Sequence, residues 1–423
     1  MRPLHLTRTA AIAAAVAVLA VGGYAVFQYL SLSTGIRKSQ VLEAPDAKAQ
    51  PHADTNILVM GLDSRLDENG KPLPQDIYDA LHSGDQSDGG LNANVLMLLH
   101  VPGDGRKATE ISIPRDDDVA LAGCPDKQCS GKIKQAYGLA ADQESHRIAG
   151  DASLDAAQRQ QKSRDAGRTA QIQTVQDFLG VHVDHFVEVT MVAFYQLAQV
   201  VQPITVCVLN DTQDRFSGAD FHRGQQQVDA AQAVAFVRQR RDEHHPELNF
   251  TDLDRERRQQ AFIVSLSTQL KQAGTLANPV KLSGILDVVK QNTAIDSGLD
   301  LLQFAQQASA LTGGNVTFYT LPIERFGKNA RGEDVNVVNV AQVRATVAQL
   351  LSPPAPSPGP TGPSTAAPSG SPAGPAPTAT PGGVGTPATQ PARPRRHPPS
   401  CRRSAAAASP ASSRAGAPSP VDE

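Results

Sequence analysis

The chain has 423 residues, a formal net charge of −3 and no tryptophan. Arg2 and Arg8 near the start and six arginines after residue 392 are basic, so the remainder is more acidic than the total. An acidic folded region argues against a protein that binds nucleic acid along its phosphate backbone.

Residues 10–30 form an apolar stretch long enough to cross the ~30 Å hydrocarbon core of a bilayer. Arg2, His5 and Arg8 precede it, and such positive flanking charge keeps that side in the cytoplasm. The alternative is a cleaved signal peptide, but the run is long for one and no small-x-small site follows closely. We expect a cytoplasmic end at residues 1–9, a single transmembrane helix at 10–30 and an extracytoplasmic remainder at the cell membrane.

The folded part of the chain is bounded by two polar segments. Residues 31–53 are predicted to be a linker. Residues 351–423 are dominated by Pro, Ala, Ser, Gly and Thr, and cannot bury enough apolar surface to offset their conformational entropy. We therefore expect a disordered tail there and one folded domain over residues 54–350.

Within this domain, strand and helix patterns alternate. Short apolar runs predict strands at residues 56–60, 95–101, 108–113, 186–189, 204–209 and 316–321. Helical spacing predicts helices at residues 165–179, 191–201, 228–237 and 254–271, and residues 66–93 read as a polar insertion. This alternation predicts a three-layer α/β/α domain around a central mixed sheet.

Cys124 and Cys129 bracket the short loop CPDKQC. Outside the cytoplasm such a pair can close as a disulfide. Zinc competes for paired cysteines, but no second Cys or His pair stands at ligand spacing. We predict a structural disulfide here.

Charged residues gather in four segments. They are GLDSR with Asp63 and Arg65, ISIPRDD with Arg115, GKIKQAY with Lys132 and Lys134, and AVAFVRQRR followed by TDLDRERRQQAF. The first two follow predicted strands, where ligands usually bind in open α/β sheets. A single charge after a strand is commonly a solvated loop residue, so the segments carry weight only together.

The last segment has the most specific pattern. Arg255, Arg258 and Gln259 share one helix face near its N-terminus, where backbone N–H groups already favour an anion. Cations there oppose the helix dipole, so stability alone does not explain them; the alternative is a solvated face paired with neighbouring acids. With Arg238 and Arg240 just upstream, the pattern suits a pyrophosphate bound by guanidinium groups and Mg²⁺.

In this order, the segments resemble the motifs of the LytR-CpsA-Psr family: G-x-D-x-R, a strand ending in P-R-D, K-I-x-x-A-Y, V-R-x-R and D-x-x-R-x-x-R-Q-Q. The likeness spans about residues 54–265. It implies an α/β domain that moves a glycopolymer phosphate from a polyprenyl-pyrophosphate lipid to peptidoglycan, assisted by Mg²⁺ or Mn²⁺, with a single N-terminal membrane helix.

The resemblance also implies a role for each matching residue. It makes Asp63, Arg115 and Arg255 catalytic and puts Asp63 and Asp252 next to the metal. The implied substrate-binding residues are Arg65, Lys132, Arg238, Arg240, Arg258 and Gln259.

One loop departs from the family pattern. Where the family has R-S-D-T, this chain has NANVL, so Asn92 and Asn94 replace an arginine and a metal-binding aspartate. An Asn carbonyl can coordinate Mg²⁺ but brings no charge. We therefore predict Asn94 as a neutral metal ligand.

Other functions stay open at this point. A non-catalytic module that binds the lipid pyrophosphate and scaffolds wall assembly is favoured by the missing acid at Asn94. A hydrolase of the lipid pyrophosphate would need only water in place of the acceptor. A transcription regulator is disfavoured by the membrane segment, the acidic domain and the lack of a helix-turn-helix signal.

Overall fold

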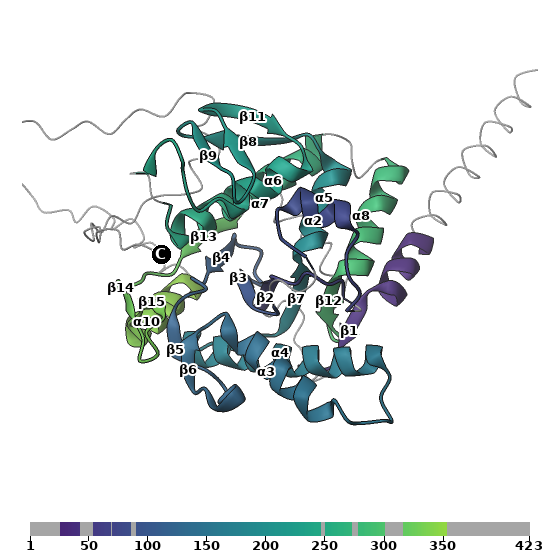
Figure 1. Cartoon of the computed structure of the whole chain (residues 1–423), viewed down its shortest axis with the longest axis vertical. Helices are drawn as coiled ribbons and strands as arrows, with labels where there is room; N and C mark the ends of the chain where they lie inside the picture. The colour runs from purple at the N-terminus through teal and green to yellow at the C-terminus, as the bar shows by residue number, and fades with distance from the viewer. Residues whose placement is uncertain are drawn as a thin grey trace, which may run out of the picture.

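A seven-stranded mixed sheet forms the centre of the protein (Figure 1). The computed structural model describes residues 26–42, 54–68, 70–85, 90–246, 250–272, 278–300 and 316–352. In sheet order the strands are β1 (Arg37–Ser39), β12 (Thr293–Asp296), β7 (His185–Thr190), β2 (Thr55–Leu62), β3 (Ala93–Val101), β4 (Ala108–Ser112) and β13 (Val316–Thr320). The predicted mixed α/β fold with a central mixed sheet is confirmed.

Strand direction decides which loops meet. β2 is parallel to β7 and antiparallel to β3, and β4 is antiparallel to β3 and parallel to β13. β2, β4 and β7 therefore end at the same edge of the sheet, where β3 begins. β12 runs antiparallel to β7 and parallel to β1.

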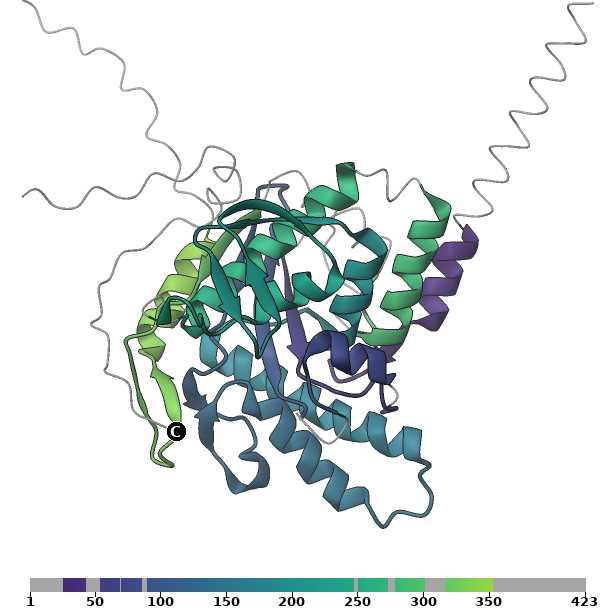
Figure 2. The same cartoon turned by 45° about the horizontal axis from the view of Figure 1, so that its top comes forward.

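Helices lie on both sides of the sheet (Figures 1 and 2). The helices α3 (Gln135–Ile148), α4 (Ala156–Leu179) and α10 (Val340–Leu351) bury one apolar core with β2, β3 and β4. On the other side lie α5 (Met191–Val201), α6 (Ala230–Arg238), α7 (Asp252–Gln272) and α8 (Pro279–Asn292), with α2 (Gln75–Leu81) beside α6. A second core joins α5, α6, α7 and β8 (Ile204–Val208).

In the part of the chain that the structure describes, four two-stranded sheets surround the central one. They pair β5 (Asp118–Ala120) with β6 (Ser130–Lys132), β8 with β11 (Gly224–Val228), β9 (Thr212–Asp214) with β10 (Ala219–Phe221), and β14 (Arg325–Lys328) with β15 (Asp334–Val337). The strand predicted at residues 204–209 thus exists as β8 but leaves the central sheet. The predicted disulfide joins Cys124 to Cys129 between β5 and β6.

The predicted linker at residues 31–53 is partly wrong. Residues 26–35 are helical and lead into β1, which pairs with β12 at one end of the central sheet. Ile36 is buried against Ile295 and Leu299. The apolar side chain of Ile36 therefore ties the start of this region to the domain.

The two ends of the chain fall largely outside the described ranges. The predicted transmembrane helix has most of its length in residues 1–25, and the predicted tail lies almost wholly in 353–423; neither part is described. In the ranges that are described, no helix is both long enough and apolar enough to cross a membrane.

Candidate active site

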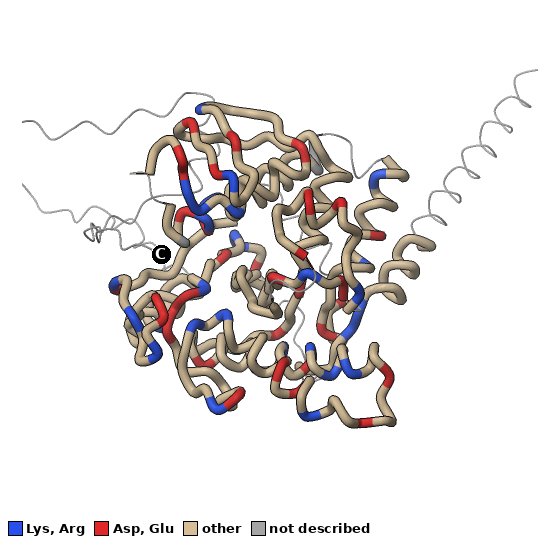
Figure 3. Tube along the Cα trace, in the orientation of Figure 1, with Lys and Arg blue, Asp and Glu red and all other residues tan. Residues whose placement is uncertain are grey.

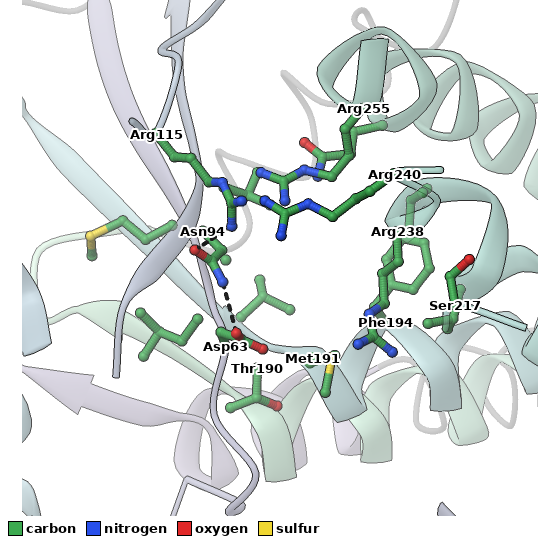
Figure 4. Close-up of a pocket in the computed structure, with 18 of the residues that line it drawn as sticks. Asp63, Asn94, Arg115, Thr190, Met191, Phe194, Ser217, Arg238, Arg240 and Arg255 are labelled. Atoms are coloured by element: carbon green, nitrogen blue, oxygen red, sulfur yellow. Dashed lines mark hydrogen bonds between the residues drawn. The ribbon is translucent and has the colours of Figure 1, made fainter. Parts of the chain in front are cut away.

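The loops after β2 and β4 bring the first two charged segments together. Asp63 directly follows β2, and Arg115 lies just beyond the end of β4. The pairing of β2 with β3 shifts register between Gly61 and Leu62, and this shift leaves Asn94 without a partner residue across the ladder. Such an irregularity re-aims a side chain, and Asn94 points toward Asp63 (Figure 4).

A chain of polar contacts links these three residues. The Nδ2 atom of Asn94 donates to Asp63 Oδ2 at 2.8 Å, and Arg115 Nη1 donates to Asn94 Oδ1 at 2.8 Å. The amide can satisfy both neighbours in one orientation only, because a carboxylate accepts and a guanidinium donates. Arg65 donates to the other carboxylate oxygen, Asp63 Oδ1. Both oxygens of Asp63 are thus engaged.

The chain of charges continues from Arg115 to Asp116. The Arg115 Nε and Lys134 Nζ atoms lie 3.5 and 2.6 Å from the Asp116 carboxylate. Burial opposes ionisation of Asp116, but the positive charges of Arg115 and Lys134 outweigh it and hold its pKa below the usual range. Charges of both signs surround the centre of the molecule in Figure 3.

Three arginines approach from the opposite side of the site (Figure 4). Arg238 ends α6, Arg240 follows two residues later, and Arg255 lies in the first turn of α7. All three line the same cavity as Asp63 and Arg115. Burial lowers the pKa of Arg238, while the charge of Asp63 opposes that shift. The predicted convergence of the arginine segment on the strand-end segments is therefore present in the fold.

Asp214, at the end of β9, holds the turn that carries Arg240. Its Oδ2 atom accepts from the backbone N–H of Arg240 at 3.2 Å and from Ser217 Oγ at 3.0 Å, and its Oδ1 atom accepts from Phe216 N at 3.0 Å. No sequence pattern singles out Asp214. Its only signal was an Asp in a polar turn, and the residues that it contacts are brought together by the fold.

Three of the predicted substrate-binding residues do not line the cavity. Arg65 holds Asp63 and the carbonyl of Ser83. Lys132 faces Asp116 at 3.9 Å. Arg65 and Lys132 therefore contact acidic residues at the edge of the site, outside the cavity.

Arg258 is the third exception, although it shares a helix with Arg255. It donates to Gln239 Oε1 at 2.6 Å and stacks on the rings of Phe236 and Phe250. Burial lowers its pKa to about 10. Arg255 and Gln259 line the cavity, but Arg258 lies about 100° around the helix from Gln259 and turns toward α6.

The cavity itself has a volume of about 500 Å³. Its charged lining consists of Asp63, Arg115 and the three arginines described above, together with Asp214 and Arg241. Apolar side chains make up much of the remaining wall: Val59, Val95, Met97, Val189, Met191, Phe194, Val234, Val237 and Ile263. The space therefore suits a molecule with an anionic part and an apolar part.

The profile of the LytR_cpsA_psr family matches residues 27–351, which is most of the chain. The chain belongs to the LytR-CpsA-Psr family. It is 36% identical over 305 residues to the "Cell wall biosynthesis protein LcpA" of Corynebacterium glutamicum, a match that covers 72% of this chain and 57% of the relative. The chain thus spans little more than half of that relative's length.

Other members of the LytR-CpsA-Psr family are more distant. A "Polyisoprenyl-teichoic acid--peptidoglycan teichoic acid transferase TagU" of Oceanobacillus iheyensis is 26% identical over 265 residues, covering 60% of this chain and 71% of the relative. Protein gbs0355 of Streptococcus agalactiae has a similar fold, with a TM-score of 0.51 and 19% identity over 73% of this chain and 91% of its own.

A metal ion is implied by the resemblance to this family, and the described residues fit it in part. Among them, no group of three or more His, Cys, Asp or Glu could hold a metal. Mg²⁺ in proteins commonly takes one or two carboxylates together with substrate phosphates, and Asp63 suits that arrangement. The Asn94 amide, however, presents its NH₂ group to Asp63. It would have to turn to become a ligand, and the side chain of Asp252 lies outside what the structure describes.

A buried ion cluster supports the loop after β2, and no local sequence pattern predicts it. Arg164 of α4 donates to Glu68 and Glu188 at 3.0 Å each, and to the carbonyl of Asp67 at 2.9 Å. Burial and the charge of Glu188 raise the pKa of Glu68 to about 7, against the effect of Arg164. The cluster ties the loop that carries Asp63 to α4, which lies on the side of the sheet away from the cavity.

Proposed function

We propose that this protein transfers a glycopolymer phosphate from a polyprenyl-pyrophosphate carrier to peptidoglycan. The observation that carries the proposal is the cavity, in which Arg115, Arg240 and Arg255 face an acid at one end of an apolar space. Guanidinium groups bind phosphate oxygens, and an apolar wall accepts a polyprenyl chain. The names of the Corynebacterium and Oceanobacillus relatives point to the same reaction class.

The reaction is a displacement at phosphorus. A peptidoglycan hydroxyl attacks the phosphorus that carries the glycopolymer, the bond to the bridging oxygen breaks, and the polyprenyl phosphate leaves. The arginines stabilise the charge that grows on the leaving phosphate. Asp63 or Asp252 accepts the proton of the attacking hydroxyl. A bound Mg²⁺ or Mn²⁺ ion would add positive charge beside these phosphates, and Asp63 would hold it.

The proposed location follows from the start of the chain. Residues 1–9 lie in the cytoplasm, residues 10–30 cross the cell membrane, and the domain faces the wall, where both substrates would be found. A disulfide between Cys124 and Cys129 suits such an oxidising compartment. Protease added to intact, wall-stripped cells should digest the domain; survival of the full chain would contradict this topology.

The full chain in detergent can be tested with lipid-linked glycan, peptidoglycan and Mg²⁺. We expect glycan to become covalently attached to peptidoglycan, with release of polyprenyl phosphate. Release of lipid phosphate without attachment, even with acceptor present, would show a hydrolase. Binding of the lipid without any product would show a scaffold. A chelator control then tests whether the attachment needs the metal.

A further inference from the structure

Two helices that are far apart in the sequence run side by side at one end of the molecule: residues 26–35 and α8 (Figure 2). Lys290 Nζ donates to Ser31 Oγ across 3.1 Å. A Cβ atom on Gly35 would lie only 2.7 Å from Lys290 Cδ, so the two helices are in close contact. Each helix leads into a strand, and these strands, β1 and β12, pair in parallel. The two helices therefore point the same way.

This packing sets how far the first turn of α8 extends along the axis of the helix formed by residues 26–35. Lys290 lies beside Gly35, and Val280 precedes Lys290 by ten residues. At about 1.5 Å per residue, Val280 is about 15 Å further along the helix axis, close to the level of Val26, where the described part of the neighbouring helix begins. That level falls within the apolar stretch 10–30, which is predicted to cross the membrane.

Two large apolar side chains near this level are exposed. Val280 is 79% exposed, the highest value for a large apolar side chain in the described part of the protein, and Phe27 is 65% exposed. The position of Val280 is well defined, because Asn278 Oδ1 caps α8 by accepting from the N–H groups of Val280 and Lys281 at 3.0 and 3.2 Å. A single exposed valine is common on protein surfaces, but this one lies near the helix whose residues 26–30 belong to the proposed membrane segment.

We infer that the first turn of α8 enters the boundary between headgroups and acyl chains of the outer leaflet. It forms a second membrane contact beside the N-terminal anchor, and the inference rests on the anchoring proposed above. Because α8 also packs on α5, which contributes Phe194 to the cavity, two contacts instead of one fix the orientation of the cavity relative to the bilayer. The partner is the lipid bilayer itself.

The lack of tryptophan in the chain allows a direct test. Three single-tryptophan variants of the full chain are reconstituted in phosphatidylcholine vesicles with or without bromine on the acyl chains. They are Val280→Trp, Phe27→Trp as the anchor reporter, and Phe326→Trp as a control, since Phe326 is 46% exposed on β14 at the opposite side of the molecule. Unchanged melting temperatures establish that each variant is folded.

We expect bromine to quench most of the emission of Val280→Trp and Phe27→Trp and none of that of Phe326→Trp. The emission of Val280→Trp should also shift to shorter wavelength when vesicles are present. Quenching of Phe27→Trp alone would overturn the α8 contact while leaving the anchor in place. If neither residue is quenched, the anchor is wrong and the α8 contact falls with it.

Discussion

The side-chain amide of Asn94 donates to the carboxylate of Asp63 at 2.8 Å and accepts from Arg115 at 2.8 Å. In the family pattern this position is an aspartate. Two carboxylates at that distance repel each other unless a cation lies between them, whereas an amide bridges the acid and the guanidinium without one. The Asn94 amide therefore satisfies Asp63 in the absence of metal.

Replacing Asn94 by Asp should raise metal affinity. The second carboxylate should tighten Mg²⁺ or Mn²⁺ binding to the lipid-free protein by about tenfold or more, equivalent to ~1.4 kcal/mol. Asp63→Ala should abolish binding in either background. Calorimetric titration of all variants measures this. Tight binding by the unmodified protein, or no change on Asn94→Asp, would remove position 94 from the metal site.

Arg255 and Arg258 form a matched pair on one helix. Arg255→Ala should lower glycan transfer by about 100-fold or more, because it removes a charge from the cavity that we propose holds the reacting phosphates. Arg258→Ala should instead lower the free energy of unfolding by about 2 kcal/mol, through loss of its stacking and its hydrogen bond to Gln239. Transfer assays and thermal melting of both variants separate the two roles. Equal losses of transfer at equal stability would contradict the assignment.

The buried carboxyl of Glu110 should make stability depend on pH. It accepts from Ser112 Oγ and from Gln260 of α7, and burial raises its pKa from 4.5 to about 8. Between these two values the folded state holds a proton that the unfolded chain has released, so the contribution of Glu110 to stability is greatest below pH 4.5 and declines as pH rises toward 8. The contribution to the slope is at most about 1.4 kcal/mol per pH unit.

Glu110→Gln replaces the titratable carboxyl by an amide that cannot ionise, and it keeps the shape of the neutral side chain. The melting temperatures of the variant and the original protein should be similar near pH 5, and the variant should be the more stable of the two near pH 9. Differential scanning fluorimetry across this range measures the difference. Parallel curves would mean that Glu110 does not titrate in this window.

The disulfide between Cys124 and Cys129 should stabilise the loop between β5 and β6. Replacing both cysteines by serine should cost about 2 kcal/mol in the chain-entropy model, because the bond closes only a short loop. Thermal melting of the double variant, compared with that of the oxidised protein, measures this loss of stability. Intact mass after alkylation, with and without reductant, shows whether the bond forms in exported protein; two free thiols would refute it.

Local patterns were sufficient to predict five of the seven strands of the central sheet, but they missed β1, β12 and the helices α3, α8 and α10. The apolar run at residues 56–60 became β2, and the spacing over 191–201 became α5 at the same bounds. The helix predicted at residues 165–179 starts earlier, at Ala156, where Asp155 and Gln158 form a capping box. That signal is local and was available in the sequence. The polar insertion at 66–93 hid α2, whose buried residues, Tyr78 and Leu81, are covered by contacts with other elements.

The candidate site divides in the same way. The sequence by itself determined which residue types are present, their order along the chain and the strand ends that carry Asp63 and Arg115, because these depend on local spacing. Only the tertiary structure decided that Arg258 leaves the cavity while Gln259 stays in it, that Asp214 holds the turn before Arg240, and that residues 37–39 belong to the sheet. Each of these depends on contacts between segments distant in sequence, and the geometry of such contacts is set by packing, which no local pattern encodes.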